Sequence, residues 1–231
     1  MTYYPLVLSL ADIDVYPVLG ELAGDPYLHD FASDSAADYE TTDFPVFQDQ
    51  VFDEIAEAGH QWAIGLYLEN RSGLLRNFPQ MISEGRIFHV GLDVTAPANT
   101  SVFAPIPGVV EKVGFDGGVG NYGGFLILKH EMGGVRFYSF YGHLRRPHVV
   151  KAGQEVAAGE KIAALGEHED SGGWFSHVHL QVLTQEAFDQ GRILQGYVDA
   201  EALQEIESLF PSPYPLFRAR SRSERSRSES R

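Results

Sequence analysis

The chain has 231 residues, enough for one large domain with an appended segment, and 44% of them are hydrophobic, as in an ordinary globular protein. It has no cysteine, which excludes disulfides and thiolate metal sites, so any metal site must use histidine and carboxylate ligands. A formal net charge of -15 argues against nucleic acid and anionic membranes as partners of the main body.

The first residues, MTYYPLVLSLADIDVYP, lack the features of a secretory signal. No Lys or Arg precedes the apolar run, and Asp12 and Asp14 end it early. No stretch approaches the roughly 20 apolar residues of a membrane-spanning helix. We therefore expect a protein that stays in the cytoplasm and does not contact a membrane.

Residues 1–85 predict a mixed N-terminal segment. The acidic stretch 32–43 is typical of a solvated loop. Residues 47–59 repeat apolar side chains at helical intervals and finish on a glycine, which predicts a helix. Residues 68–85 predict a covering loop or a short helix.

From residue 86 the pattern changes to short runs of β-branched and aromatic residues, punctuated by Gly and Pro. This spacing predicts a mainly β domain over residues 86–185. Gly153 and Gly159 flank a short strand, as at a tight corner of a barrel. Strand alternation predicts that four residues of one run share a face: Phe137, Ser139, Tyr141 and His143.

Residues 186–217 predict a C-terminal helical segment, with one amphipathic helix over residues 199–210. The last stretch, residues 218–231, holds six Arg and two Glu and has one Ala as its apolar residue, which predicts a disordered tail. Because it has no apolar surface to bury, we expect it to be dispensable for folding and hydrolysis. Such a basic tail is able to bind nucleic acid or a partner protein, or to lie loosely on the acidic body.

Two short motifs carry metal-ligating residue types: HVGLD at 89–93 and HVH at 177–179. Because strand side chains alternate, we predict that His89, Gly91 and Asp93 share one face. His177 and His179 share a face by the same rule, roughly 7 Å apart. Three such groups around one ion match a catalytic zinc site, which uses three N or O ligands and leaves one position open.

Each motif alone is a weak signal, because a lone histidine is usually structural. Both together in one β-rich segment, with His143 between them, are much harder to obtain by chance. The remaining histidines of the chain are interpreted as structural: His29, His60, His130, His148 and His168.

Residues 86–185 resemble the lysostaphin-like zinc endopeptidases, which cut peptide cross-links of bacterial cell walls. The motifs HVGLDV, GNYGGFLILKH, FYGHL, VVKAGQEVAAGEKIAALG and SHVHLQV follow in the family's order. The resemblance implies a hybrid-barrel or β-sandwich metallopeptidase domain that holds one zinc ion and hydrolyses peptide bonds through an activated water. It also implies that the zinc ligands are His89, Asp93 and His179.

The same resemblance implies that His143 and His177 are the catalytic residues. They would hydrogen-bond the attacking water or the developing oxyanion, one as general base and the other as electrostatic stabiliser. The sequence leaves open which residue has which role. Asn121 matches a position that contacts substrate in the family.

Several residues depart from the commonest wall-hydrolase pattern. Ser176 stands where Pro is usual, and Leu180 and Gln181 stand where Phe and Glu are usual. Trp174 occupies a loop where small residues are common. These features and the stretch 61–71 are more similar to a peptidase module of some large intracellular proteins, which lies between a kinase-like phosphotransferase and an aminotransferase. The substrate therefore stays open between peptidoglycan cross-links and a soluble peptide or amide.

Two other readings compete with the peptidase: a metal-free β scaffold, and a non-catalytic hybrid-barrel binding or carrier module. Residues 149–166 resemble the glycine-flanked strands of lipoyl, biotinyl and sugar phosphotransferase carriers. A phosphocarrier would use histidines but would not need Asp93. A lipoyl or biotinyl carrier needs a modifiable Lys on an exposed hairpin, whereas the lysines are predicted in or beside strands: Lys112, Lys129, Lys151 and Lys161. Mass spectrometry for bound zinc or a covalent adduct separates these classes.

Overall fold

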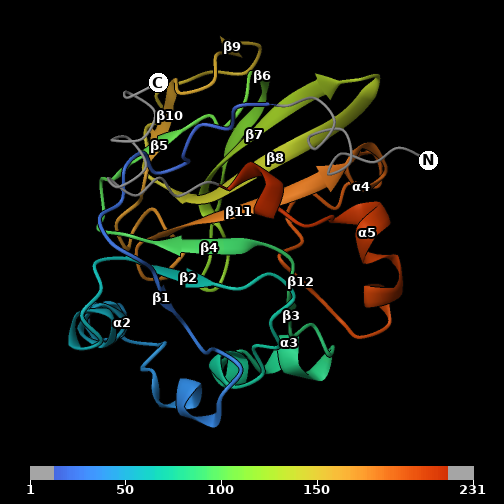
Figure 1. The fold of residues 1–231 in the computed structure, drawn as a ribbon. Helices are drawn as coiled ribbons and strands as arrows, with labels where there is room; N and C mark the ends of the chain where they lie inside the picture. Colours follow the sequence, from blue (N-terminus) through green and yellow to red (C-terminus); the bar gives the residue numbers. More distant parts are fainter. Residues whose placement is uncertain (1–12, 218–231) are drawn as a thin grey trace.

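A computed structural model describes residues 13–217 and is mainly β, as expected (Figure 1). The strands are β1 (Tyr27–Leu28), β2 (Ala63–Gly65), β3 (Phe88–His89), β4 (Leu92–Thr95), β5 (Ser101–Phe103), β6 (Gly108–Asp116), β7 (Gly123–Met132), β8 (Val135–Leu144), β9 (Glu155–Val156), β10 (Lys161–Ala164), β11 (His177–Thr184) and β12 (Tyr197–Val198). One large sheet has the order β1-β2-β4-β11-β8-β7-β6-β9, and it is antiparallel except for the β1–β2 pair. Two small sheets pair β10 with β5 and β12 with β3.

Helices lie around this sheet (Figure 1). They are α2 (Phe44–Glu57), α3 (Pro79–Ser83), α4 (Gln185–Asp189) and α5 (Ile206–Leu209), with 3-10 turns η1 (Asp34–Asp38), η2 (Leu74–Asn77), η3 (Ala202–Glu205) and η4 (Tyr214–Leu216). The expected helix near residues 47–59 is therefore present as α2, three residues earlier. Its N-cap is Asp43, whose carboxylate accepts from the Val46 amide, and Gly59 with a φ of +82° follows its end.

The single amphipathic helix expected over residues 199–210 is wrong. The structure divides this stretch into η3 and α5, and Glu205, the last residue of η3, leaves helical geometry at φ -109° and ψ 6°. Ile206, Leu209 and Phe210 are buried all the same. Packing against the sheet determines the conformation of this segment, because a helix of one turn has little stability of its own.

Both faces of the large sheet are covered by apolar side chains. Alternation along β11 sends Val178, Leu180 and Val182 into the first core, which also contains residues of β5 and β10. The opposite face packs against the C-terminal segment, with Leu183 and Phe210 in one cluster. Because they alternate with the first set, His177, His179 and Gln181 lie on this second face.

A third apolar cluster joins the N-terminal segment to the domain. Buried Phe47, Val51 and Ile55 of α2 contact this cluster together with Leu74 and Phe175. The segment before residue 86 therefore packs directly beside β11, the strand that begins at His177.

The HVGLD run is not one continuous strand, but the prediction that His89, Gly91 and Asp93 share one face is confirmed. His89 Nε2 and Asp93 Oδ1 lie 2.9 and 3.0 Å from His179 Nδ1, and a Cβ added at Gly91 would lie 2.2 Å from His179 Cε1. His89 ends β3, which pairs with β12, whereas Asp93 lies in β4, which pairs with β2 and β11. Val90, between the two strands, is buried in the core of the second face. Two strands of different sheets therefore bring His89 and Asp93 together.

The expectation that His143 shares a face with Phe137 and Tyr141 is also wrong. The β7–β8 register shifts between the Gly124–Leu144 and Leu126–Tyr141 pairs, which marks a β-bulge. His143 itself has a φ of +60°, a left-handed conformation that is uncommon outside glycine. Alternation fails at this bulge, and the His143 ring turns to the second face, 4.2 Å from that of His177 between centroids.

The corner at Gly153 and Gly159 is confirmed, since both have positive φ, +83° and +78°, on either side of β9. Within residues 13–217, no helix is long and apolar enough to cross a membrane. The tail over residues 218–231, for which we expect disorder, lies outside the described residues, as do residues 1–12 of the N-terminal segment.

Candidate metal centre

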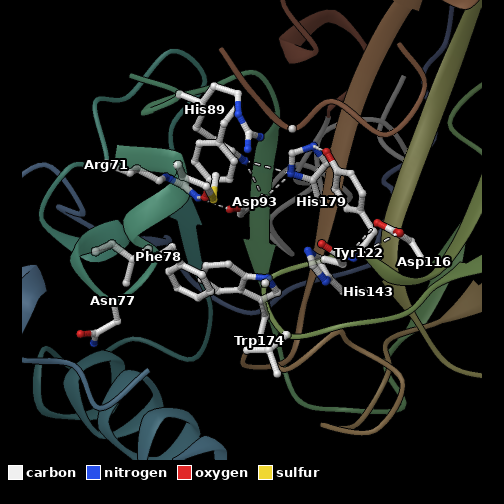
Figure 2. A pocket seen from close by; sticks show the side chains of 18 of the residues that line it. Arg71, Asn77, Phe78, His89, Asp93, Asp116, Tyr122, His143, Trp174 and His179 are labelled. Atoms are coloured by element: carbon white, nitrogen blue, oxygen red, sulfur yellow. Dashed lines mark hydrogen bonds and ion pairs between the residues drawn. The ribbon is translucent and has the colours of Figure 1, made fainter. Parts of the chain in front are cut away.

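The five histidine and aspartate residues singled out from the sequence converge at one place in the fold. In the β4–β11 pair, His179 lies directly opposite Asp93. His89 reaches the same point from the end of β3, and His143 from the bulged end of β8 (Figure 2). His177, two residues before His179, lies on the same face of β11.

Three donor atoms form a small triangle. His89 Nε2 lies 2.9 Å from His179 Nδ1, and Asp93 Oδ1 lies 3.0 Å from His179 Nδ1 and 3.3 Å from His89 Nε2. A tetrahedral zinc ion with bonds of about 2.0–2.1 Å separates its ligand atoms by roughly 3.3 Å. All three residues are 2% exposed or less. The donor set and its spacing therefore fit a zinc ion with three protein ligands.

Hydrogen bonds fix which nitrogen of each ligand imidazole carries the proton. His89 Nδ1 lies 3.1 Å from the Leu66 carbonyl oxygen, and His179 Nε2 lies 2.9 Å from Gln181 Oε1. Carbonyl oxygens only accept, so these nitrogens donate their N–H. The lone pairs of His89 Nε2 and His179 Nδ1 then face the centre of the triangle, as metal ligation requires.

The protonation states of His89 and Asp93 also suit metal binding. Burial lowers the pKa of His89 to about 3, with help from the Arg71 cation, so the imidazole is neutral at neutral pH. Burial alone would raise the pKa of Asp93, but His89 and Arg71 outweigh it and hold that pKa well below its usual range. The site therefore offers a neutral imidazole at His89 and an ionised carboxylate at Asp93.

Arg71 is the outer partner of the aspartate. Its Nη1 donates to Asp93 Oδ2 at 2.6 Å, while its Nε donates to Glu69 Oε2 at 3.0 Å. Glu69 in turn accepts from the Phe31 amide at 2.9 Å. Arg71 and Asp93 are both 2% exposed, so this is a buried ion pair that leaves Oδ1 turned to the triangle.

His143 and His177 lie beside the triangle without belonging to it. The Nδ1 of His143 donates to the Ser171 carbonyl at 2.6 Å, and that of His177 donates to the Phe175 carbonyl at 2.8 Å. Each Nε2 is then unprotonated, and His177 Nε2 lies 3.7 Å from Asp93 Oδ1. Burial lowers the pKa of both rings, so both are neutral bases at neutral pH.

Asn121 lies at the rim of the pocket and is exposed. Its amide donates to the Gly117 carbonyl at 2.8 Å and to Asp116 Oδ1 at 3.4 Å, so it is held by its own loop. Its neighbour Tyr122 reaches the centre instead, with its hydroxyl 3.2 Å from both His179 Nε2 and Gln181 Oε1.

A cavity of about 460 Å³ opens over these residues. Sequence reasoning did not assign roles to Arg71, Tyr122 or Gln181, which orient the ligands. Tyr122 follows Asn121 in the motif GNYGGFLILKH, and Gln181 stands where the wall hydrolases usually have Glu. No spacing rule pointed to Arg71, which comes from outside the strand-rich segment.

The other histidines do not join the centre. His29 is buried and its Nε2 lies 3.3 Å from Thr95 Oγ1, and His130 bonds the Pro107 carbonyl oxygen at 2.8 Å. Throughout residues 13–217, one group of three His, Cys, Asp or Glu side chains could hold a metal ion, and it is His89, Asp93 and His179.

Comparisons with known proteins relate part of the chain to one peptidase family. Residues 87–190 match peptidase family M23. The chain is 39% identical over 94 residues to an uncharacterized metalloprotease of Haemophilus influenzae. These aligned residues are 40% of this chain and 18% of that protein. The chain thus spans about one fifth of that relative's length.

Similar solved structures include the catalytic domain of the antimicrobial peptidase lysostaphin from Staphylococcus simulans, at 23% identity over 52% of this chain and 80% of that one, with a TM-score of 0.39. A zinc-containing peptidase from Vibrio cholerae is 27% identical over 49% of this chain and 30% of that one, with a TM-score of 0.34. The family match spans β3 to α4, and the three donors of the triangle lie within it. Residues 87–190 of this chain, which hold the three donors of the triangle, are therefore similar to peptidase family M23.

Proposed function

We propose that this chain is a zinc-dependent peptidase whose ion is held by His89, Asp93 and His179. The observation that carries the proposal is the triangle of two imidazole nitrogens and one carboxylate oxygen, with edges of 2.9, 3.0 and 3.3 Å. Two neutral nitrogens and one hard oxygen favour zinc over magnesium or calcium, which prefer oxygen ligands throughout. Each of the three residues also has a hydrogen-bond partner outside the triangle that orients its donor atom: the Leu66 carbonyl for His89, Gln181 for His179 and Arg71 for Asp93. Such partners are typical of metal-ligating residues.

A bound zinc ion supplies Lewis acidity, which polarises a carbonyl and lowers the pKa of water from about 15.7 toward about 7. The chain's own residues have the remaining tasks. His143 and His177 are proposed to face the attacking water and the scissile carbonyl, because their Nε2 atoms carry lone pairs on the centre's side. One would take the proton from the water, and the other, once protonated, would stabilise negative charge on the carbonyl oxygen.

The proposed substrate is a peptide, either a peptidoglycan cross-link or a soluble peptide. The pocket supports a peptide because it combines apolar walls with a few polar groups, as peptide and small-ligand sites do. The match of residues 87–190 to peptidase family M23 supports the same class. Asn121, at the rim, is proposed to contact the substrate.

Metal analysis beside hydrolysis tests the proposal. Wild type purified with zinc should hold one ion per chain and cleave a glycine-rich peptide, while Asp93→Ala should lose both properties. Asp53→Ala, an exposed change on α2, is the matched control and should keep both. Full zinc occupancy in Asp93→Ala would show that the ligand set is wrong, and a covalent lipoyl, biotinyl or phosphoryl adduct in place of zinc would favour the carrier module.

A further inference from the structure

The Phe78 ring lines the pocket over the proposed metal site, beside Trp174 (Figure 2). The Phe78 ring stacks on Trp174 with ring centroids 5.4 Å apart and planes at 18°. Its edge meets Gly120, where an added Cβ would lie 2.6 Å from Phe78 Cε1. Three segments far apart in the sequence therefore touch at this one ring.

The position of Phe78 is fixed from both sides. Phe78 ends η2, where its amide donates to the Leu75 carbonyl at 2.8 Å, and its own carbonyl accepts from the Ile82 amide of α3 at 3.2 Å. Leu74 and Leu75, just before it, are fully buried in the third apolar cluster. The ring is thus presented by an anchored turn, which makes it a wall of the pocket.

This wall begins next to the proposed reacting groups. The Trp174 ring meets His143 edge-on, with 6.5 Å between centroids. The loop that carries Gly120 is tied to the loop before Trp174, because the Gly120 amide donates to the Gly172 carbonyl at 2.9 Å. The Phe78 and Trp174 rings stack against each other, so a peptide chain cannot pass between them.

The rest of the pocket is small and has an apolar mouth. Its volume of about 460 Å³ falls within the range of small-molecule sites. A sphere of that size is roughly 10 Å across, the length of roughly three extended residues. Val119 and Leu194, which line the pocket, are 66% and 42% exposed, so the pocket is open to solvent at these two residues.

We propose that the substrate is a short peptide, or the terminal part of a longer one, whose chain ends against the Phe78–Trp174 wall. This inference rests on the proposed peptidase function. In the reaction, water oxygen bonds to the carbonyl carbon, the C–N bond breaks and the departing nitrogen takes a proton, so that a small terminal fragment is released. Phe78 is the residue that excludes the interior of a long chain.

The test uses the full zinc-loaded chain and a mixed peptide library of three to twenty residues, with cleavage positions read by mass spectrometry. Wild type should cut close to one chain end, and Phe78→Ala should add cuts in the interior of the longest peptides, raising their rate at least tenfold. Ile82→Ala, an exposed apolar change on α3, is the matched control and should keep the wild-type pattern. Phe78→Leu, which keeps apolar volume, should give an intermediate pattern even where Phe78→Ala folds poorly.

The outcomes separate this inference from the function on which it rests. If wild type cuts interior bonds as often as terminal ones, the peptidase stands and the wall does not select substrates. The same conclusion follows if Phe78→Ala and Phe78→Leu, both folded by circular dichroism, keep the wild-type pattern. If no peptide in the library is cleaved by any of the proteins, the proposed function fails, and the inference fails with it.

Discussion

Gln181 Oε1 lies 2.9 Å from His179 Nε2, so a neutral amide holds the proposed metal ligand in its tautomer. The same oxygen lies 3.2 Å from the Tyr122 hydroxyl, and the Gln181 amide nitrogen donates to the Gln195 carbonyl at 3.1 Å. The last bond orients the amide, so Oε1 rather than Nε2 faces the histidine. A residue two positions along β11 thus prepares His179 for ligation.

The first prediction follows from this contact. Gln181→Leu removes the acceptor, so the His179 N–H loses its partner and zinc affinity should fall about 10–100-fold. Gln181→Glu keeps an acceptor and adds negative charge, so its affinity should equal or exceed that of wild type. Competition against a fluorescent chelator measures both, with Gln204→Leu, an exposed change, as control. Wild-type affinity in Gln181→Leu would contradict an orienting role.

The second prediction separates ligands from catalytic groups. His143→Ala and His177→Ala should keep most of their zinc and their fold but lose turnover about a hundredfold to a thousandfold, because each removes a group that faces the developing charge. His179→Ala should lose zinc and turnover together. Zinc content and peptide hydrolysis, measured on the same preparations, give the answer. Loss of metal in His177→Ala with retention in His179→Ala would reverse the two assignments.

The sequence predicts the mainly β domain and all five residues of the centre, because alternation and motif spacing act over a few neighbouring residues. It does not predict how strands of different sheets meet. His89 and Asp93 come together from strands of two different sheets, which Val90 and Gly91 connect, and His143 turns inward through a bulge and a φ of +60°. These features depend on packing between distant segments, which no local pattern records.

Arg71 and the Phe78 wall were beyond sequence reasoning for the same reason. Both come from the segment before residue 86, whose pattern predicts a covering loop and no chemistry. Arg71 acquires its role from Asp93, 22 residues away, and Phe78 acquires its role from Trp174. The helical turns that hold Phe78 are set by buried leucines in a third apolar cluster, and not by a periodic signal.

The third prediction concerns Gly91. A Cβ at this position would lie 2.2 Å from His179 Cε1 and 2.5 Å from its Nε2, closer than real Cβ contacts allow. Gly91→Ala should therefore displace the imidazole and lower zinc affinity at least tenfold. Gly191→Ala is the control, because its φ of +72° makes it cost about 1 kcal/mol of stability while nothing lies within 4 Å of its Cβ. If the two variants bind zinc equally well, the close approach of Gly91 to His179 is not required.

The last prediction concerns His130, a buried histidine remote from the proposed catalytic groups. Its Nδ1 donates to the Pro107 carbonyl at 2.8 Å, and its Nε2 lies 2.7 Å from Ser139 Oγ, which can donate to it. Burial lowers the pKa of His130 to about 4, against an ordinary value of about 6.5 in the unfolded chain. Between these two values the unfolded chain binds more protons than the folded one, so the free energy of unfolding falls as the pH falls.

From pH 7 to pH 5 this single group should remove about 2 kcal/mol of stability. His130→Gln keeps a donor and an acceptor without titrating, so its stability should fall less over the same interval, by about that amount. Urea unfolding of both metal-depleted proteins at the two pH values measures the difference, and the remaining titrating groups cancel between them. An equal pH dependence in both proteins would show that His130 is protonated in the folded state, because a neutral buried ring must take up its proton on unfolding below pH 6.5.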